Sequence, residues 1–305
     1  MELSFAICTY NRFELTMKCI NSIFEAYCPH LFRFEILLID NGSKDRTPEI
    51  PELLNDNRLV YCYEPRQGLS YARNRALDMA NAPWLVYIDD DALIHHDFID
   101  NWLKIKGKEK FVCIGGKYLA YFENAKPKWW PQDWGTKPDI TPEFSEISTP
   151  ELSGGVLFLN LKLLPHDIRF RGDLGMKGGY ISYGEENYFQ SQLLERGLKL
   201  AYAPELKIDH LVASRKISIL WQLKNAYLHG KLTWMKSNRK KPPFYKGFRA
   251  VKTITSEFIQ NCRHAFKKIS GPNYYFQNLI LETSKPLLLS IGKALGKEND
   301  EPNEK

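Results

Sequence analysis

Apolar runs of strand length alternate with helical patterns through residues 1–90, and this alternation limits the possible folds more than any other feature of the sequence. Short, almost continuous apolar strands that alternate with helices are typical of a parallel sheet covered on both faces. The pattern predicts strands at 3–8, 34–40, 58–64 and 84–88, and helices at 14–27, 47–55 and 69–80. We therefore expect an α/β fold, a Rossmann-like and mostly parallel sheet flanked by helices.

The second half of the chain continues the sheet and then becomes helical. Residues 120–152 contain KPKWWPQDWG and further prolines, which favour a long surface excursion over sheet. Beyond it the pattern predicts a strand at 154–160, a helix at 184–197, two short strands within 198–212, and helices at 217–235 and 244–269. The sequence thus predicts an α/β domain at 1–215 and a mainly helical region at 216–305.

The distribution of charge divides the chain at nearly the same place. Residues 1–205 hold 23 Lys and Arg against 29 Asp and Glu, whereas residues 206–305 hold 19 against 7. An apolar stripe runs along the basic helix expected at 244–269, and basic amphipathic helices commonly lie on anionic membrane surfaces. We expect peripheral membrane contact through these helices, with a helical cap or a homodimer interface as the alternatives. No nucleic-acid partner is expected, because no recognition module accompanies the charge.

Several classes of protein are disfavoured by what the sequence lacks. No uninterrupted apolar run reaches the roughly 18 residues of a membrane span, and MELSFAICTYNR lacks the layout of a secretory signal. We therefore expect a cytoplasmic protein, peripheral on the inner face of the cell membrane. The 6 cysteines have no C-x-x-C spacing, which favours buried thiols over zinc or disulfides. No G-x-G-x-x-G follows a strand, which excludes a dinucleotide-dependent dehydrogenase.

Three consecutive aspartates, Asp89, Asp90 and Asp91, follow directly on an apolar strand pattern. Adjacent carboxylates repel one another, so the cluster is either a solvated turn or the site of a positive partner. A hard dication such as Mg²⁺ or Mn²⁺ takes carboxylate oxygens and shares its remaining shell with substrate phosphates. Asp40 also ends a predicted strand. Because open parallel sheets bind ligands at the carboxyl ends of strands, we expect Asp40 and the cluster on one edge.

An ordered series of motifs over residues 3–230 resembles the GT-A-fold glycosyltransferases of family 2, inverting enzymes that use nucleotide sugars. The motifs are ICTYNR (7–12), LLIDNGSKD (37–45), RQGLSYARNRAL (66–77), YIDDDA (87–92), SGGVLFLN (153–160), GEENYFQSQLLERG (184–197) and IDHLVASRKISILWQLKNAYLHG (208–230). Residues 231–305 match no motif of the family. The resemblance implies a GT-A catalytic domain and a D-x-D metal motif.

The resemblance places a nucleotide at the strand ends. It implies that the base and diphosphate lie against Thr9, Tyr10, Arg12, Asp40, Arg73, Asp89, Asp90 and Arg215. The carboxylate of Asp40 would accept a hydrogen bond from a uracil ring nitrogen, which favours a UDP-sugar; a helix N-cap is the structural alternative. Arg73 would meet base or phosphate charge, or else lie on a solvated helix face. Arg215 would pair with the leaving diphosphate when a loop closes.

The resemblance also implies the metal ligands and the catalytic base. Asp91 would ligate Mn²⁺ or Mg²⁺, with Asp89 near the ribose or a metal-bound water and His210 completing the shell; a structural histidine is the alternative for His210. In the family the base is the Asp of a Gly-Glu-Asp run, whereas here Glu186 takes that position and Glu185 precedes it. Any acidic pair that opens a helix is also favoured by the helix dipole.

The remaining expectations concern the sugars. Gly154 and Gly155 would lie beneath the donor sugar. Trp129, Trp130 and Trp134 would stack on a donor or acceptor ring, or else anchor a long loop in the core. The acceptor is expected to be a saccharide or a lipid-linked molecule in cell-surface polysaccharide or glycolipid synthesis.

Two other functions stay open. A nucleotidyltransferase on a related fold usually carries a glycine-rich, basic loop after its first strand, whereas CTYNRFE has no glycine. A non-catalytic, sugar-binding descendant of a transferase would have lost the acidic cluster or the base, and both are present in this chain.

Overall fold

The structure is a computed structural model that describes residues 1–295 apart from 124, 132–133, 177–183 and 237–243. The chain forms two compact units. Unit 1 comprises Met1–Tyr121 and Gly135–Leu211, and unit 2 comprises Phe122–Trp134 and Val212–Lys305. This division falls slightly before the predicted boundary at residues 215 and 216, and it assigns to unit 2 a segment that the sequence pattern did not separate from the first domain.

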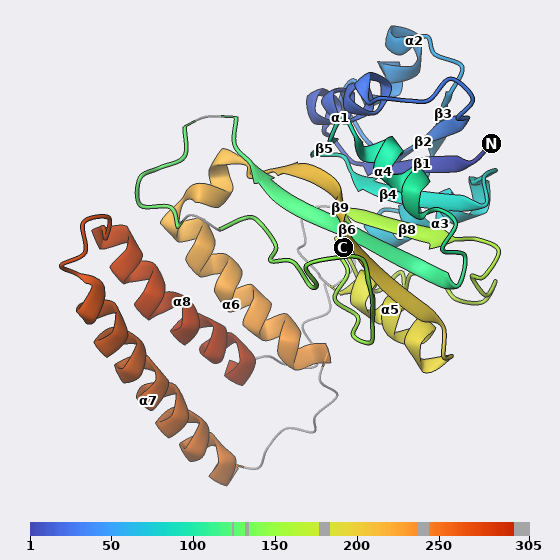
Figure 1. The fold of residues 1–305 in the computed structure, drawn as a ribbon. Helices are drawn as coiled ribbons and strands as arrows, with labels where there is room; N and C mark the ends of the chain where they lie inside the picture. Colours follow the sequence, from blue (N-terminus) through green and yellow to red (C-terminus); the bar gives the residue numbers. More distant parts are fainter. Residues whose placement is uncertain (124, 132–133, 177–183, 237–243, 296–305) are drawn as a thin grey trace. The chain divides into compact units, whose positions relative to one another are not determined.

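In the described part of unit 1, nine strands form one sheet (Figure 1). They are β1 (Leu3–Thr9), β2 (Phe34–Asp40), β3 (Leu59–Tyr63), β4 (Trp84–Asp89), β5 (Ala92–Ile94), β6 (Phe111–Tyr121), β7 (Ser145–Ile147), β8 (Val156–Asn160) and β9 (Lys199–Leu211). Their order in space is β3-β2-β1-β4-β8-β6-β9-β5, with β7 on β9. β1 to β4 are mutually parallel, as are β6 and β9, while β5, β7 and β8 are antiparallel to their neighbours.

Helices pack on both faces of this sheet because successive strand residues point to opposite sides. The helical segments are α1 (Phe13–Glu25), the 3-10 helix η1 (Thr47–Glu49), α2 (Ile50–Leu54), α3 (Leu69–Met79), α4 (Phe98–Ile105) and α5 (Glu185–Glu195). Phe5 of β1 belongs to the core shared with α1 and α4, whereas its neighbour Ala6 belongs to the core shared with α3 and α5. The fully buried Trp102 of α4 stacks on Phe158 with ring centroids 4.4 Å apart. The predicted α/β class is confirmed.

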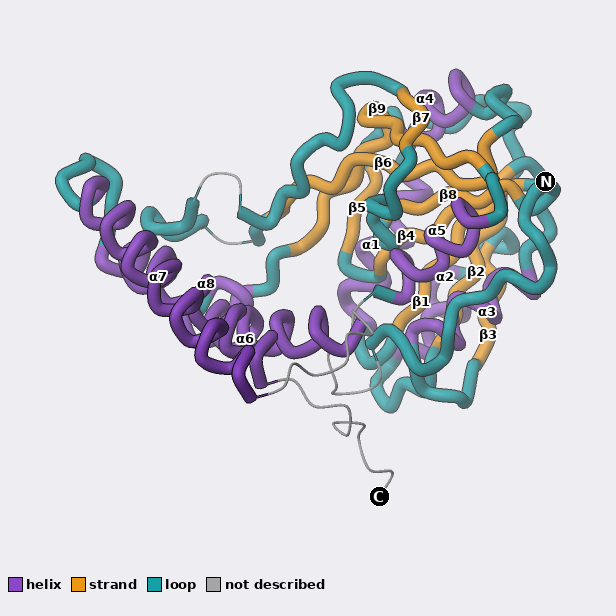
Figure 2. Tube along the Cα trace, turned by 90° about the horizontal axis from the view of Figure 1, so that it is seen from below, coloured by secondary structure: helices purple, strands orange, loops and turns teal. Residues whose placement is uncertain are grey.

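Unit 2 is mainly helical in its described residues, apart from those of Phe122–Trp134. It contains the 3-10 helix η2 (Ser214–Ile217) and the helices α6 (Ile219–Lys236), α7 (Phe244–Lys268) and α8 (Phe276–Leu295). α8 packs against both α6 and α7, and Figures 1 and 2 show the three helices side by side. At Gly230 of α6 an added Cβ would lie 2.0 Å from the carbonyl oxygen of Leu289, so the absence of a side chain lets α6 and α8 approach closely. No helix among the described residues is long and apolar enough to cross a bilayer.

Two predictions of secondary structure are wrong. Residues 198–212 form the single strand β9 and not two strands; its pairing with β6 shifts between Ala203 and Lys207, around Pro204. The stretch 120–152 was expected to lie outside the sheet, yet it contains β7 and the end of β6. In β9 the proline concerned is Pro204. Proline lacks a backbone donor and interrupts the local strand pattern, but it is tolerated in a strand where the pairing is already irregular.

Candidate active site

The carboxyl ends of β1, β2 and β4 form one edge of the parallel part of the sheet. Thr9 at the end of β1 is level with Asp40 at the end of β2, and Cys8 is level with Asp89 at the end of β4. The expectation that Asp40 and the aspartate cluster share one edge is confirmed. The side chains that follow these strands therefore converge on one region of unit 1.

A short antiparallel pairing brings His210 to the aspartate cluster. The chain turns through Asp90 and Asp91 into β5, and Ala92 pairs with His210 of β9. The backbone N–H of Leu211 donates to the carbonyl oxygen of Asp91 at 2.9 Å, which fixes the register next to the acids. A residue far along the chain is thus held beside Asp91 by backbone hydrogen bonds.

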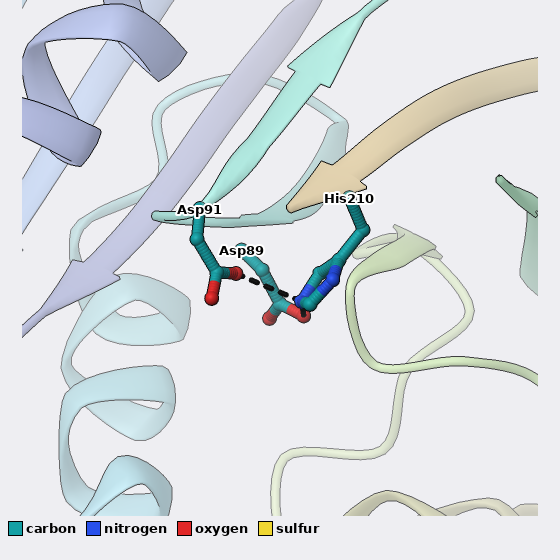
Figure 3. A group of neighbouring side chains, drawn as sticks. All are labelled: Asp89, Asp91 and His210. Atoms are coloured by element: carbon teal, nitrogen blue, oxygen red, sulfur yellow. Dashed lines mark ion pairs between the residues drawn. The ribbon is translucent and has the colours of Figure 1, made fainter. Parts of the chain in front are cut away.

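Asp89, Asp91 and His210 point toward one another, as Figure 3 shows. His210 Nε2 lies 2.8 Å from Asp91 Oδ1 and 3.9 Å from Asp89 Oδ2. One ligand atom from each residue falls within 4.8 Å of the others. The His210 ring stacks on Tyr118 at a centroid distance of 4.4 Å, which limits its rotation. Two carboxylates and an imidazole at this spacing fit a dication such as Mn²⁺ or Mg²⁺.

Arg12 supplies a positive charge to the rest of the cluster. Its Nη1 lies 2.8 Å from both Asp90 Oδ1 and Asp91 Oδ2, and these two carboxylates are almost fully buried. Burial raises the pKa of Asp90 to about 6, even though the charge of Arg12 opposes this rise. The attraction of Asp90 raises the pKa of Arg12 in turn. The family resemblance implied that Arg12 lies against the nucleotide, whereas in the structure its guanidinium contacts Asp90 and Asp91.

Asp40 is fully buried and both of its carboxylate oxygens have partners inside the protein. Oδ1 accepts from the backbone N–H of Ser43 at 2.8 Å, and Oδ2 accepts from the Tyr61 hydroxyl at 2.8 Å. Burial and the hydrogen bond to Asp40 raise the pKa of Tyr61. The carboxylate therefore closes the turn after β2. A nucleobase that binds here would have to share an oxygen that already accepts one hydrogen bond.

The loops after β1 and β2 are joined next to Asp40. Asn11, in the left-handed backbone region with φ of 53°, donates its backbone N–H to Ser43 Oγ at 2.9 Å. Its side-chain Oδ1 accepts from the backbone N–H of Lys44 at 2.7 Å. Thr9 is buried and its hydroxyl contacts that of Thr16 at 2.8 Å, while Tyr10 is half-buried at the start of the loop. These contacts hold the predicted nucleotide-binding segments together.

Arg73 connects the aspartate cluster with the acidic pair that opens α5. Its guanidinium is buried, with Nη1 2.9 Å from Glu185 Oε1 and Nη2 3.9 Å from Asp89 Oδ1. It also lies over the rings of Tyr87 and Phe170, at 5.8 and 5.4 Å from their centroids. The solvated alternative for Arg73 therefore does not apply. Its position makes it an electrostatic link between the two groups of carboxylates.

Gly154 and Gly155 leave room for two of these side chains. A Cβ on Gly154 would lie 2.5 Å from Arg73 Nη2, and a Cβ on Gly155 would lie 2.4 Å from Asp89 Oδ2. Real Cβ atoms do not approach other atoms so closely, so neither position accepts a side chain without displacing its neighbour. The glycine pair before β8 thus shapes the site by the close approach of Arg73 and Asp89.

The two glutamates at the start of α5 have different surroundings. Glu185 is buried against Arg73, and burial raises its pKa to about 7, with the charge of Arg73 opposing that rise. Glu186 is half-buried; burial alone would raise its pKa, but the charge of Arg73 helps to bring it below the ordinary glutamate value. Its Oε2 accepts no hydrogen bond from the described residues. Glu186 is therefore ionised at neutral pH, and one of its carboxylate oxygens is buried without a hydrogen-bond partner among the described residues.

Lys137 and Tyr118 also lie among the candidate site residues, although no pattern in the sequence indicated them. Lys137 Nζ donates to Ser153 Oγ at 3.0 Å and lies 5.3 Å from the ring centroid of Tyr118, which in turn stacks on His210. The charge of Lys137 also contributes to the lowered pKa of Glu186. Lys137 follows a proline-rich stretch with no periodic pattern, so no local signal indicated that it belongs to the site.

Four of the predicted site residues belong to unit 2. Trp130 is 5% exposed and packs edge-on against Phe122 and Trp134, with centroid distances of 6.1 and 5.3 Å. Its Nε1 donates to the carbonyl oxygen of Trp134 at 2.9 Å, and the carbonyl oxygen of Trp129 accepts from Asn278 Nδ2 at 2.6 Å. The tryptophans thus anchor the described residues of 122–134 within unit 2. The Arg215 side chain lies outside what the structure describes.

Solved structures with a similar fold are glycosyltransferases. Mannosyltransferase PcManGT from Pyrobaculum calidifontis, in complex with GDP-Man and Mn²⁺, matches 96% of this chain and 87% of its own with a TM-score of 0.63 at 17% identity. S. aureus TarS 1–349 matches 96% of this chain and 90% of its own with a TM-score of 0.55 at 15% identity. TarS 1–349 in complex with UDP-GlcNAc matches 74% and 66% with a TM-score of 0.50 at 18% identity. These likenesses establish the GT-A fold.

The sequence comparisons then identify the family. Succinoglycan biosynthesis protein ExoM of Rhizobium meliloti (strain 1021) is 24% identical over 237 residues, which are 75% of this chain and 73% of ExoM. The family model for glycosyl transferase family 2 matches residues 4–164, more than half of the chain. The chain belongs to glycosyl transferase family 2 and is a glycosyltransferase.

Proposed function

We propose that the chain transfers a sugar from a nucleotide-sugar donor to a hydroxyl acceptor, with inversion at the anomeric carbon and with Mn²⁺ or Mg²⁺ held by Asp89, Asp91 and His210. The observation that carries this proposal is the approach of these three ligands at the carboxyl ends of β4 and β9. Arg73 joins them to the acidic start of α5, so that a base lies in the same unit as the metal ligands.

In this proposal Glu186 takes the proton of the acceptor hydroxyl. The hydroxyl oxygen forms a bond to the anomeric carbon, the bond from that carbon to the diphosphate breaks, and the diphosphate leaves with the electron pair. A single displacement of this kind inverts the anomeric configuration. When bound, the dication supplies positive charge to the leaving diphosphate. Glu185 is paired with Arg73 and would keep that guanidinium in place.

The nucleotide preferred by the donor site is the finer part of the proposal. We favour a UDP-sugar, because Asp40 ends β2 on the same edge as the metal ligands and accepts hydrogen bonds there. PcManGT was solved with GDP-Man and TarS with UDP-GlcNAc, so similar folds accept both kinds of nucleotide. The screen that tests the function must therefore include UDP-, GDP- and dTDP-sugars.

The test is donor hydrolysis by the purified chain with each nucleotide sugar and either Mn²⁺ or Mg²⁺. We expect turnover of one donor class, and a loss of about a hundredfold or more in Asp91→Asn, which keeps the side-chain volume but removes a ligand charge. Asp100→Asn is the matched control, because that carboxylate is exposed and pairs with Lys104. Equal turnover by Asp91→Asn and the unaltered chain would remove the metal site from the mechanism.

The acceptor and its location form a second step of the proposal. The name of ExoM refers to succinoglycan biosynthesis, and we propose that this chain likewise acts in the synthesis of a polysaccharide or glycolipid, on a saccharide or lipid-linked acceptor. Peripheral membrane contact is supported by α7 and the turn after it, where Ile259, Phe266 and Ile269 are 46%, 63% and 46% exposed. Exposed apolar side chains on a basic helix suit the boundary of an anionic bilayer.

A further inference from the structure

Unit 2 contains a cavity that the transferase reaction does not explain. It has a volume of about 600 Å³ and is lined by residues of α6, α7 and α8 together with Trp134. Sites for small organic molecules are commonly about 300–1,000 Å³ and mostly apolar, with a few polar groups. Ala226, Leu281 and Leu289 supply apolar surface to this cavity. Its size and lining thus fit a ligand with an apolar body.

A lysine in this cavity carries a charge that no acid of the described residues neutralises. Lys285 Nζ donates to the neutral Gln222 Oε1 at 2.9 Å and lies 4.1 Å from the ring centroid of Trp134. Burial lowers the pKa of Lys285. The nearby acid Glu282 is already engaged by Lys268 Nζ at 3.1 Å and by the Tyr274 hydroxyl at 3.2 Å. A partly buried ammonium without a carboxylate partner is costly unless an anion joins it.

Further donors line the same cavity. Asn225 and His229 of α6 and Asn261 and His264 of α7 lie along its walls. Asn261 and His264 together with Lys285 offer more donors than the two oxygens of a carboxylate require, whereas Asn225 and His229 already have interactions within the protein. A phosphate group presents three or four acceptor oxygens and binds well where several donors gather around a cation.

We propose that this cavity binds an amphiphilic phosphate, with the phosphate at Lys285 and the apolar chain along Leu281 and Leu289. Charge complementarity selects the head group, and the apolar lining selects the chain. The inference does not depend on the proposed transferase reaction, since every residue that carries it lies in unit 2 and the metal ligands lie in unit 1. Failure of one proposal would leave the other standing.

The experiment is isothermal titration calorimetry of the full chain with decyl phosphate below its critical micelle concentration. Inorganic phosphate tests the head group without a chain, and decyl maltoside tests the chain without a charge. We expect decyl phosphate to bind at least tenfold more tightly than either of the other probes. Lys285→Met should weaken decyl phosphate by about tenfold or more, because it removes a charge-assisted hydrogen bond but keeps the apolar stem. Lys285→Arg should retain most of the affinity.

The control variant is Lys293→Met, which removes an exposed lysine from the same helix and should leave binding unchanged. Melting temperatures of all variants establish that unit 2 is folded. The proposal is overturned if decyl phosphate does not bind, or if Lys285→Met and Lys293→Met bind it equally. It is also overturned if inorganic phosphate binds as tightly as decyl phosphate, or if the chain binds only to anionic vesicles and does so equally well in Lys285→Met.

Discussion

At the scale of single residues, the positive charge of Arg12 offsets the repulsion among three adjacent aspartates. One guanidinium contacts both Asp90 and Asp91 at 2.8 Å, so the cluster has a built-in counter-charge. We predict that Arg12→Met lowers the free energy of unfolding by about 1–3 kcal/mol, because the buried carboxylates of Asp90 and Asp91 lose a positive partner, although Asp91 keeps its contact with His210. Mn²⁺ should then raise the melting temperature of Arg12→Met more than that of the unaltered chain, since the dication replaces part of the lost charge.

Thermal denaturation with and without Mn²⁺ measures both effects. Arg46→Met is a suitable control, because that arginine is mostly exposed; it pairs with the exposed Glu49 and lies 4.6 Å from the ring centroid of Phe13. Equal stabilities of Arg12→Met and Arg46→Met would show that the cluster does not need Arg12. A smaller response to Mn²⁺ in Arg12→Met than in the unaltered chain would contradict the electrostatic account.

The two glutamates that open α5, Glu185 and Glu186, give separate predictions. Glu186→Gln should reduce sugar transfer by at least a hundredfold while nucleotide binding changes little, because the amide keeps the volume of the base but does not take a proton. Transfer rates with acceptor and nucleotide affinity by calorimetry, measured on the same preparations, distinguish the two effects. Normal transfer in this variant would assign the base to another residue.

The raised pKa of Glu185 leads us to predict that the stability of the fold depends on pH. The pKa of this carboxyl is about 7 in the folded chain against an ordinary value of 4.5, so between these values the folded state holds a proton that the unfolded state has released. Stability should therefore fall as the pH rises through this window. In Glu185→Gln the fall in stability that this carboxyl causes should disappear. Glu195→Gln, at the exposed end of α5, should behave like the unaltered chain. Urea denaturation at pH 5 and pH 8 measures the difference.

At the scale of elements, Gly155, which directly precedes β8, positions a metal ligand because it has no side chain. We predict that Gly155→Ala lowers Mn²⁺ affinity by at least tenfold while the chain stays folded, because the new Cβ would lie 2.4 Å from Asp89 Oδ2 and 3.0 Å from its Cγ. Gly107→Ala is the matched control, since nothing lies within 4 Å of a Cβ there. Calorimetric titration with Mn²⁺ compares the two. Unchanged affinity in Gly155→Ala would mean that Asp89 does not ligate the metal.

Elements with a strong local pattern were predicted from the sequence, and elements without one were not. β1 and β2 are apolar almost throughout, and α1 repeats apolar residues at helical spacing. The spacing of the apolar residues therefore indicates which of these elements are strands and which is a helix. β6 was missed because Gly115 and Gly116 interrupt its apolar pattern; in the structure they make room for Leu152 and for the backbone of β9 at Leu206. α8 was predicted only as part of the mainly helical region 216–305 and without bounds of its own, because it continues through Pro286, which local rules place outside helix interiors.

At the scale of the whole molecule, some contacts of the candidate site could be predicted from the sequence and others could not. Parallel strands bring Asp40 and Asp89 to one edge, and this followed from the strand pattern. The approach of His210 to Asp91 depends on the antiparallel register of β5 and β9, which no local pattern encodes; the family resemblance indicated it instead. Neither the strand pattern nor the resemblance indicated the pairing of Arg12 with the cluster, because it depends on how the loop after β1 places Arg12 beside the turn that follows β4.

The uneven distribution of charge leads to a prediction about the complete chain. Residues 206–305 hold 19 basic and 7 acidic side chains, and α7 exposes Ile259 and Phe266 among them. We predict that the full chain floats with vesicles that contain anionic lipid and much less with zwitterionic vesicles, because charge attracts the helix and apolar side chains insert at the boundary. High salt should weaken the association, since it screens exposed charges.

Phe266→Ser separates the apolar contribution from the charge, because it alters neither the net charge nor a buried residue. Burial of such a side chain is worth about 1.5–3 kcal/mol, so vesicle affinity should fall by about tenfold or more. Leu31→Ser is the control, since Leu31 is 84% exposed but belongs to unit 1. If Phe266→Ser and the control float equally while light scattering shows that Phe266→Ser alone separates two copies of the chain, the exposed face of α7 is a homodimer interface and not a membrane contact.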